Sequence, residues 1–396
     1  MLIAGAGPLG WTCARLLARK KIRTLLVDPL VKHNSSPWTQ KGLGIFWPSL
    51  NDPPTRAVVA HGRSMAGWLQ EYCKHGQDLI GEFIPSSEIK QLNCFRAGIL
   101  EHEIDELNKA MQQNLGLKNP QTFSKAKIFQ ESSPAFWLRG KKNFDLPPDE
   151  ESFLSLQCGS VDSVSESKDH CLSKLSTGEM LKSEMIILAN GFEIAKLEPW
   201  LKDMLIPMTD IESHWISNFL CPQNAEPFAL RASSGHVAAL FFPHEDSTGL
   251  KTWAIRMTGP RFMLPSAGAG LQVSDQKIDA NLKDRIGQWL ATFLLPALCE
   301  FLQSPEPAEI KLQIQDARYA IDCLPCDELP ILGDLGHQGR ILGSTGWLGC
   351  GWSASLQSAT ILSELIERGQ SSMLAPLLRP RRWRSGFGEG GVTGMT

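Results

Sequence analysis

The first thirty residues constrain the fold more than any other part of the sequence. The apolar run Met1–Ala4 leads into Gly5-Ala6-Gly7-Pro8-Leu9-Gly10, which has the pattern G-x-G-x-x-G. Residues 9–20 then carry apolar side chains at helical spacing, and residues 22–27 form a second apolar run. A strand, a glycine turn, a helix and a strand in this order predict a parallel βαβ unit.

Each glycine of the pattern has a purpose in a nucleotide-binding turn. Gly5 permits the tight turn, Gly7 lets the backbone approach a pyrophosphate, and Gly10 lets the helix pack closely on the strand. The helix N-terminus favours an anion because its N–H groups are unpaired and its dipole is positive there. Asp28, at the end of the second strand, is placed to bind a ribose hydroxyl. The unit therefore predicts a dinucleotide, and by itself it leaves NAD and FAD open.

The later parts of the chain favour FAD. A nicotinamide dehydrogenase usually continues directly into further βα units, whereas here the next buried strand, Met185–Ala189, comes only after a long excursion. It ends at Asn190-Gly191, and a last helix is predicted over 353–368. An NAD(P) enzyme remains an alternative.

Two motifs near the carboxyl end carry a family resemblance. Asp327-Glu-Leu-Pro-Ile-Leu-Gly333 is followed by the strand and loop Gly343-Ser-Thr-Gly-Trp-Leu-Gly-Cys-Gly-Trp-Ser353. This arrangement resembles the D-amino-acid oxidase, glycine oxidase and sarcosine oxidase superfamily of FAD enzymes, which has a D-x-x-P-x-x-G turn, a strand and a T-G-x-x-x-x-G loop entering the last helix. The resemblance covers the N-terminal unit, residues 186–191 and the C-terminal third, and only faintly residues 196–310.

The resemblance implies an α/β chain with a Rossmann-type (glutathione-reductase-like) FAD-binding domain and an inserted antiparallel-sheet substrate domain. We expect the FAD-binding domain to comprise 1–45, 94–116, 153–196 and 324–370, the substrate domain 46–93, 117–152 and 197–323, and a C-terminal tail 371–396.

The final loop has the composition that contact with a flat ring requires. Four glycines within residues 343–351 let the backbone lie against a flavin, and the positive helix end would stabilise charge on the reduced ring. A tight turn packed on the core is the alternative. From these motifs and the family resemblance, the expected FAD-binding residues are Gly5, Gly7, Pro8, Leu9, Gly10, Asp28, Pro29, Ser36, Gly44, Val161, Ala189, Asn190, Gly191, Gly346, Trp347, Leu348, Gly349, Cys350, Gly351 and Trp352.

A further local similarity concerns oxygen. Phe242-Pro243 and then Gly249-Leu250-Lys251 are similar to the strand pair of monomeric sarcosine oxidase that presents a lysine above the flavin. In that family the lysine promotes reaction of the reduced flavin with O2, so the resemblance makes Lys251 the candidate for oxygen activation. A solvated hairpin lysine is the alternative.

The substrate-binding arginine of the family has no direct counterpart, because its position falls at Asp322. The candidates to bind a carboxylate through two parallel hydrogen bonds are Arg318, Arg256 and Arg261. If none does, the substrate is an amine without a carboxylate. The cysteine that links flavin covalently in sarcosine oxidases falls at Ala320, so noncovalent FAD is expected.

The Cys323/Cys326 pair lacks the second Cys/His pair of a zinc site and a helix start that would activate a thiol, so inert thiols are expected and no metal site.

The composition excludes several other classes of function. The 396 residues carry a net charge of −3 without a polybasic patch, so neither nucleic acid nor a membrane surface is an expected partner. No apolar run reaches the ~20 residues that span a bilayer. Ten irregularly spaced cysteines indicate reduced thiols and a cytoplasmic protein.

The expected reaction is removal of hydride from a C–H next to the nitrogen of a small amine or amino acid, delivered to flavin N5, with O2 as electron acceptor. The alternative is an FAD-dependent monooxygenase, or a maturation or tailoring flavoenzyme that acts on another protein or a natural-product intermediate.

Overall fold

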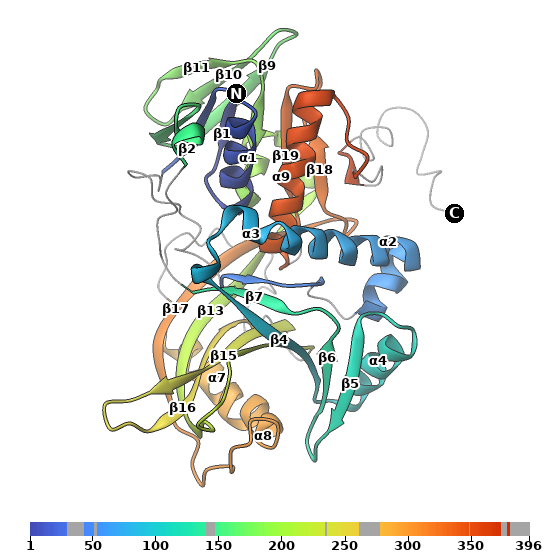
Figure 1. Ribbon diagram of the computed structural model, residues 1–396, viewed down its shortest axis with the longest axis vertical. Coiled ribbons are helices and arrows are strands. Elements are labelled where there is room, and N and C mark those ends of the chain that lie inside the picture. Colours follow the sequence, from blue (N-terminus) through green and yellow to red (C-terminus); the bar gives the residue numbers. More distant parts are fainter. Residues whose placement is uncertain are drawn as a thin grey trace.

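The computed structural model of the protein (Figure 1) divides into a region with a parallel sheet and a region with a large curled sheet. Helix α2 runs between the two regions in this view. The structure describes residues 1–29, 43–50, 54–139, 147–233, 236–260, 278–347, 349–373 and 378–380.

The parallel sheet begins with the predicted βαβ unit. Within the described residues its six strands run in the order β18-β19-β12-β1-β2-β8, and only β18 is antiparallel to its neighbour. The strands are β1 (Leu2–Ala4), β2 (Thr24–Asp28), β8 (Leu154–Cys158), β12 (Ile186–Leu188), β18 (Ile331–Asp334) and β19 (Ile341–Thr345).

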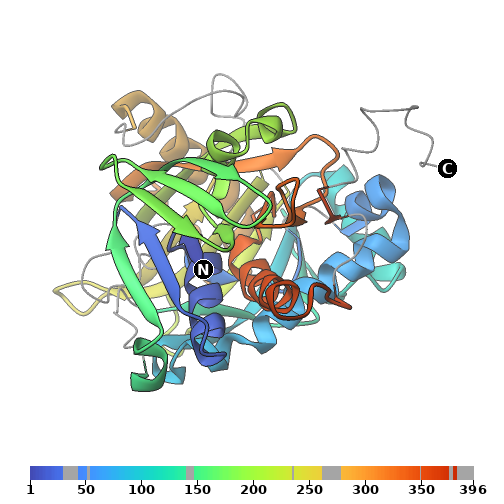
Figure 2. The ribbon, with the colours of Figure 1, turned by 90° about the horizontal axis from the view of Figure 1, so that it is seen from above.

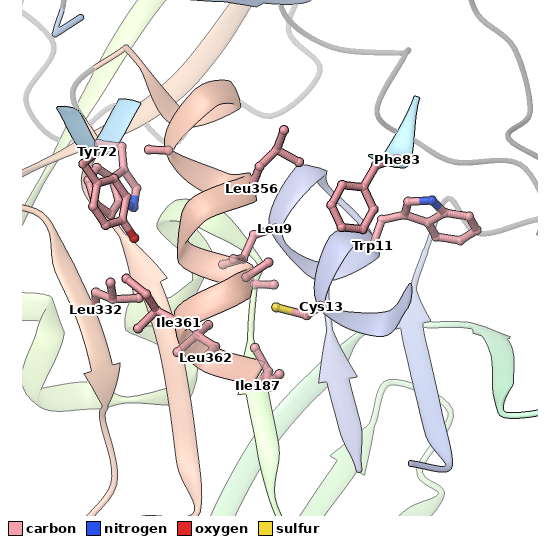
Figure 3. Packing of buried hydrophobic residues seen from close by; sticks show 14 of the residues in the cluster. Leu9, Trp11, Cys13, Tyr72, Phe83, Ile187, Leu332, Leu356, Ile361 and Leu362 are labelled. Atoms are coloured by element: carbon pink, nitrogen blue, oxygen red, sulfur yellow. The ribbon is translucent and has the colours of Figure 1, made fainter. Parts of the chain in front are cut away.

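Two helices cover this sheet, α1 (Pro8–Arg19) and α9 (Gly351–Arg368), and they lie side by side (Figure 2). Proline is tolerated at the start of α1 because the first N–H groups of a helix have no internal partner. Leu9 and Cys13 of α1 meet Leu356 of α9 above Ile187 of β12 in one buried cluster (Figure 3). The apolar stripe read from the sequence is therefore the packing face of α1.

A second, antiparallel sheet forms the excursion between β8 and β12. Its strands are β9 (Val161–Glu166), β10 (Cys171–Leu175) and β11 (Met180–Ser183). The carboxylate of Glu166 accepts hydrogen bonds from the backbone N–H groups of His337, Gln338 and Arg340, at 2.6–2.8 Å. This contact ties the small sheet to the β18–β19 turn.

The large sheet is mainly antiparallel and has the order β17-β13-β16-β15-β14-β4-β6-β5, with β3 and β7 attached beside β4. The strands are β3 (Ile45–Phe46), β4 (Ile89–Gly98), β5 (Leu117–Thr122), β6 (Lys127–Glu131), β7 (Ala135–Leu138), β13 (Leu205–Leu220), β14 (Phe228–Ala232), β15 (Val237–Glu245), β16 (Lys251–Thr258) and β17 (Leu312–Pro325).

The remaining helical segments are α2 (Pro54–Asp78), α3 (Ile80–Phe83), η2 (Ser86–Glu88), α4 (Glu101–Gln112), α5 (Pro148–Glu151), η3 (Gly191–Glu193), α6 (Ile194–Leu197), η4 (Pro199–Asp203), α7 (Ala280–Trp289), the π-helix η7 (Leu290–Leu294) and α8 (Leu295–Leu298). Of the segment 94–116, which we assigned to the FAD-binding domain, residues 94–98 belong to β4 and pair with β14 and β6 of the large sheet.

The two faces of the large sheet differ in what covers them. On one face Trp215, Ile255 and Met257 pack in one cluster with residues of α7 and α8, and we call this the outer face. The alternate residues of the same strands, such as His214 and Arg256, lie on the opposite, inner face. Asp322 belongs to the inner face and accepts a hydrogen bond from Gly349 N–H (3.1 Å), so this face is turned toward the start of α9.

A buried ion pair joins α1 to the short helix α5. The Glu150 carboxylate accepts hydrogen bonds from Arg15 (2.6 and 3.1 Å) and Arg19 (2.7 Å), and Arg15 and Glu150 are both buried. Burial by itself would raise the pKa of Glu150, but the hydrogen bonds from Arg15 and Arg19 outweigh it, so the pKa lies below its ordinary value.

Glu150→Gln removes the charge and is expected to lower the free energy of unfolding by about 3 kcal/mol at pH 7. Because the folded pKa is depressed, the wild-type advantage is present above the unfolded pKa, about 4.3, and is lost as the pH falls through the folded pKa. Urea unfolding of both proteins at pH 7 and pH 3 measures this. Exposed Glu151→Gln is the control. Equal losses at both pH values would assign the effect to packing instead.

Candidate functional site

The candidate site lies at the carboxyl edge of the parallel sheet. β1, β2, β12 and β19 are parallel, so the loops that follow them come together at this edge. Ala189 donates a backbone hydrogen bond to Ala4 (2.8 Å), and the Thr345 hydroxyl donates to Gly191 O (3.2 Å). The structure therefore brings together the three loops 5–10, 189–191 and 346–351.

The glycines of the first loop differ in what surrounds them. A Cβ at Gly5 would lie 2.7 Å from Ala189 O, and Gly5 has a φ of +98°. A Cβ at Gly10 would lie 1.8 Å from Gly5 O. A Cβ at Gly7 would meet no atom of the described residues within 4 Å. Gly5 and Gly10 are therefore required by the fold itself, whereas Gly7 borders open space at the N-terminus of α1, where a pyrophosphate would lie.

Asp28 ends β2 beside this loop, as predicted. Its Oδ2 accepts a hydrogen bond from Ala6 N–H at 2.8 Å, which fixes the carboxylate against the glycine turn. Pro29 O accepts a hydrogen bond from the Cys158 thiol (3.4 Å), and Val161 follows the end of β8 at the same edge. The predicted FAD-binding residues Asp28, Pro29 and Val161 thus lie at one edge of the sheet.

Asn190, between β12 and α6, has a buried side-chain oxygen for which the described part of the chain supplies no hydrogen-bond partner. An unpartnered buried acceptor costs about 1–3 kcal/mol, so its presence at a loop edge indicates a ligand donor. Together with the open Gly7, it fits the polar diphosphate and sugar part of a dinucleotide.

The loop 346–351 is held in place by residues of the large sheet. Gly346 has a φ of +80°, and a Cβ there would lie 2.4 Å from Pro325 Cγ. Thr345 Oγ1 lies 3.1 Å from the Cys323 thiol, and Asp322 holds Gly349 N–H. Among the described residues, no atom lies within 4 Å of where a Cβ at Gly351 would be, and no side chain caps the N-terminus of α9. The loop is thus rigid on one side and open at the helix start.

Two residues of this loop point into the core. Trp347 donates to Ser344 Oγ (2.7 Å) and stacks on Tyr72 with ring centroids 4.6 Å apart. Cys350 is buried, and a hydrogen bond with Cys73 together with burial raises the pKa of its thiol well above the ordinary value. The side chains of Trp347 and Cys350 are therefore part of the core, and only their backbone can contribute to a ligand site.

Trp352, by contrast, is half-buried and meets Phe46 edge-on, with ring centroids 5.4 Å apart. Gly44 directly precedes β3 and lies beside β7. Its carbonyl oxygen accepts a hydrogen bond from Leu138 N–H (2.9 Å). Ser36, Leu348 and Arg261 lie outside the described residues.

A buried charged cluster, which sequence reasoning missed, anchors residues 47–50, which follow β3. Arg231 and Arg96, both on the inner face, donate to Leu50 O at 2.7 and 2.6 Å and to Ser49 Oγ at 2.8 and 3.1 Å. Glu131 accepts from Ser49 (2.8 Å) and lies 3.1 Å from Arg96. Arg96 and Arg231 are distant in sequence and are brought together by the pairing of β4 with β14. No local sequence pattern therefore predicts this cluster.

This anchored segment also reaches α9. The Arg231 guanidinium lies 4.1 Å above the Trp47 ring, and Trp47 O accepts a hydrogen bond from Ser353 in the first turn of α9 (2.7 Å). The large sheet therefore positions the start of α9 from two sides, through Asp322 and through Trp47.

The structure separates the three predicted catalytic residues. Lys251 lies on the outer face at a hairpin end, 3.4 Å from Gln223 Oε1 and 3.9 Å from Glu245. Arg318 and Arg256 lie on the inner face. Only the two arginines thus face the side of the candidate site.

The two arginines differ in their partners. Arg318 is paired with Glu212 at 2.6 Å. Arg256 is exposed, and no carboxylate in the described ranges pairs with it.

The two thiols of the Cys323/Cys326 pair lie in different environments. Burial raises the pKa of Cys323 to about 12, and Cys326 is exposed. Among the described residues no cluster of three His, Cys, Asp or Glu side chains could hold a metal ion, and no described helix is long and apolar enough to cross a bilayer.

Comparison with solved structures places this architecture among known folds. The chain matches L-proline dehydrogenase from P. horikoshii over 97% of both chains, with a TM-score of 0.62 and 13% sequence identity. It matches glycine oxidase from Geobacillus kaustophilus over 96% of this chain and 97% of that chain, with a TM-score of 0.62 and 12% identity. It also matches Amadoriase I, the fructosyl amine:oxygen oxidoreductase from Aspergillus fumigatus. This match covers 96% of this chain and 88% of that chain, with a TM-score of 0.62 and 15% identity.

The chain has the fold of these amine and amino-acid oxidoreductases. The predicted fold is thereby confirmed, and glycine oxidase is one of the enzymes that the two carboxyl-terminal motifs resemble. No family model and no curated protein sequence matches the chain.

The two glycines of the first loop provide a matched test. Gly7→Val is expected to fold normally and to lose bound cofactor by more than 90%, an order-of-magnitude expectation, because the added side chain enters only the open space. Gly10→Val is expected to prevent folding because it collides with Gly5 O. Circular dichroism and cofactor absorbance per mole of protein measure both. A folded Gly7→Val protein with full cofactor content would contradict this assignment.

Proposed function

We propose that the protein is an FAD-dependent oxidoreductase that oxidises a C–N bond of a small amine or amino acid. The observation that carries the proposal is the meeting of two open glycine positions, Gly7 and Gly351, each at the uncapped start of a helix and both at one sheet edge. One helix start suits a diphosphate and the other suits the pyrimidine edge of a flavin. The fold shared with glycine oxidase and L-proline dehydrogenase supports the same function.

In this proposal the backbone of Gly7, Pro8 and Leu9 holds the diphosphate, and Asp28 and Asn190 bind the sugar part. The backbone of residues 349–352 faces the ring, and Asp322 keeps that loop in position. Bound FAD would supply the hydride acceptor for the substrate carbon. The contribution of the chain is orientation and a positive helix end aimed at the place where negative charge develops.

The inner face of the large sheet is the proposed substrate side. Arg256 is the better candidate for binding a substrate carboxylate, because the charge of Arg318 is already matched by Glu212. A guanidinium can bind a carboxylate through two parallel hydrogen bonds. An amine substrate without a carboxylate would leave Arg256 unused.

Reoxidation by O2 is part of the proposal, and it is supported by the oxidases among the structural neighbours. The placement of Lys251 on the outer face does not support its proposed role in oxygen activation. A tailoring role in a biosynthetic pathway is the second candidate, because NikD, an amino acid oxidase essential for nikkomycin biosynthesis, has the same fold (TM-score 0.63). The ten free cysteines fit a reducing compartment such as the cytoplasm.

Anaerobic titration of the purified protein with a panel of primary and secondary amines and amino acids tests the function. We expect a yellow protein whose visible absorbance is bleached by at least one member of the panel and returns on admission of air, with an imine-derived carbonyl as product. Reduction by NADH or NADPH without bleaching by any amine would contradict C–N oxidation and favour a monooxygenase.

Two charge-removing variants on opposite faces of one strand separate the sites. Arg256→Met is expected to raise KM for a carboxylate substrate roughly 10- to 100-fold, since a charge-assisted bidentate contact contributes about 1.5–3 kcal/mol. Lys251→Met is expected to leave flavin reduction and reoxidation within about threefold of wild type, a difference under about 0.7 kcal/mol. Stopped-flow absorbance resolves the two half-reactions. Slow reoxidation in Lys251→Met alone would restore the oxygen-activating role of that lysine.

A further inference from the structure

Three rings lie next to one another on the inner face of the large sheet. The Trp137 and Phe242 ring centroids are 5.8 Å apart with an interplanar angle of 32°. The Phe242 and His214 centroids are 5.7 Å apart at 36°. The rings come from β7, β15 and β13, and all three residues are half-buried. We call these three residues the ring row.

Both ends of the ring row carry a polar atom without a partner. Trp137 Nε1 and His214 Nε2 are buried, and neither has a hydrogen-bond partner in the part of the chain that the structure describes. Buried polar atoms are nearly always hydrogen-bonded, and each exception costs about 1–3 kcal/mol. The fold therefore keeps a donor and a ring nitrogen unsatisfied at a half-open aromatic surface, as a binding site would.

The surroundings keep the His214 ring neutral. Burial lowers the pKa of His214, and Arg256 and His244 lower it further, while Asp316 acts in the opposite direction. Arg256 is the direct cross-strand neighbour of His214, and the next position of β16 on this face is Ala254, which pairs with Phe242. A neutral ring can stack without exposing a charge to an apolar ligand.

We propose that the ring row binds a flat aromatic group of the substrate, with Arg256 beside it for an anionic group. The inference rests on the proposed function and deepens it, because it names the substrate class as an aryl-bearing amine or amino acid. Offset stacking between aromatic rings contributes about 0.5–1.5 kcal/mol per pair beyond the burial of apolar area. A saturated ring of similar size gains only the burial.

Isothermal titration calorimetry of the flavin-containing protein with indole-3-acetate, cyclohexylacetate and acetate tests the proposal. We expect indole-3-acetate to bind at least about fivefold more tightly than cyclohexylacetate, the factor that one to two stacking contacts provide. Phe242→Leu and, separately, Trp137→Leu should reduce this preference to less than about twofold and leave the affinity for acetate unchanged.

Phe136→Leu is the matched control, because Phe136 precedes Trp137 in β7 and packs against the core cluster on the other side. This variant should keep the preference. Equal wild-type affinities for the aromatic and saturated probes, absence of binding by all three, or a preference that survives both ring-row substitutions would overturn the proposal.

The calorimetric result is independent of turnover, so the two hypotheses can fail separately. A protein that prefers the aromatic probe but is bleached by no amine would contradict the proposed function alone. A protein that is bleached by aliphatic amines and shows no preference would contradict the ring-row proposal alone.

Discussion

The contact on which the candidate site depends is the backbone packing of Gly10 against Gly5. At 1.8 Å from Gly5 O, a side chain at position 10 has no room, and this closeness seats α1 directly on β1 and β12. The helix start is thereby held at the carboxyl edge of the sheet, beside Asp28 and Ala189. The anion-binding geometry is thus a result of packing, and of Gly5, Gly7 and Gly10 it is Gly7 at which a Cβ would meet no described residue within 4 Å.

The second half of the site depends on the large sheet. Asp322 fixes the loop before α9 at Gly349, and the Arg231–Trp47–Ser353 series of contacts fixes the first turn of α9. The two regions of the molecule are therefore joined at the place where the flavin ring is proposed to lie. A substrate on the inner face of the sheet would lie against the same elements that position the cofactor loop.

The features of the molecule that could be predicted from the sequence are local ones. The strand, turn and helix of residues 1–20, the place of Asp28 at the end of β2 and the final helix follow from short patterns with known geometry. The burial of Trp347 and Cys350 against Tyr72 and Cys73 could not be predicted, because it depends on α2, which is remote in sequence.

The substrate side could not be predicted because it depends on strand register. In β16 a shift of one residue exchanges the faces, so the sequence could not decide that Arg256 is inward and Lys251 outward. The pairings of His214 with Arg256 and of Arg231 with Arg96 join segments tens to more than a hundred residues apart. The pairing of Arg318 with Glu212 likewise joins two strands that are remote in sequence, so no local pattern predicts that this charge is matched.

The central claim is that one dinucleotide bridges the starts of α1 and α9, and a crystal structure of the protein with FAD tests it most directly. The account predicts the diphosphate within hydrogen-bonding distance of the backbone N–H groups of residues 7–9, and the ring between the loop 346–351 and the inner face of the large sheet. A diphosphate at another edge of the sheet, or a ring remote from residues 349–352, would contradict it.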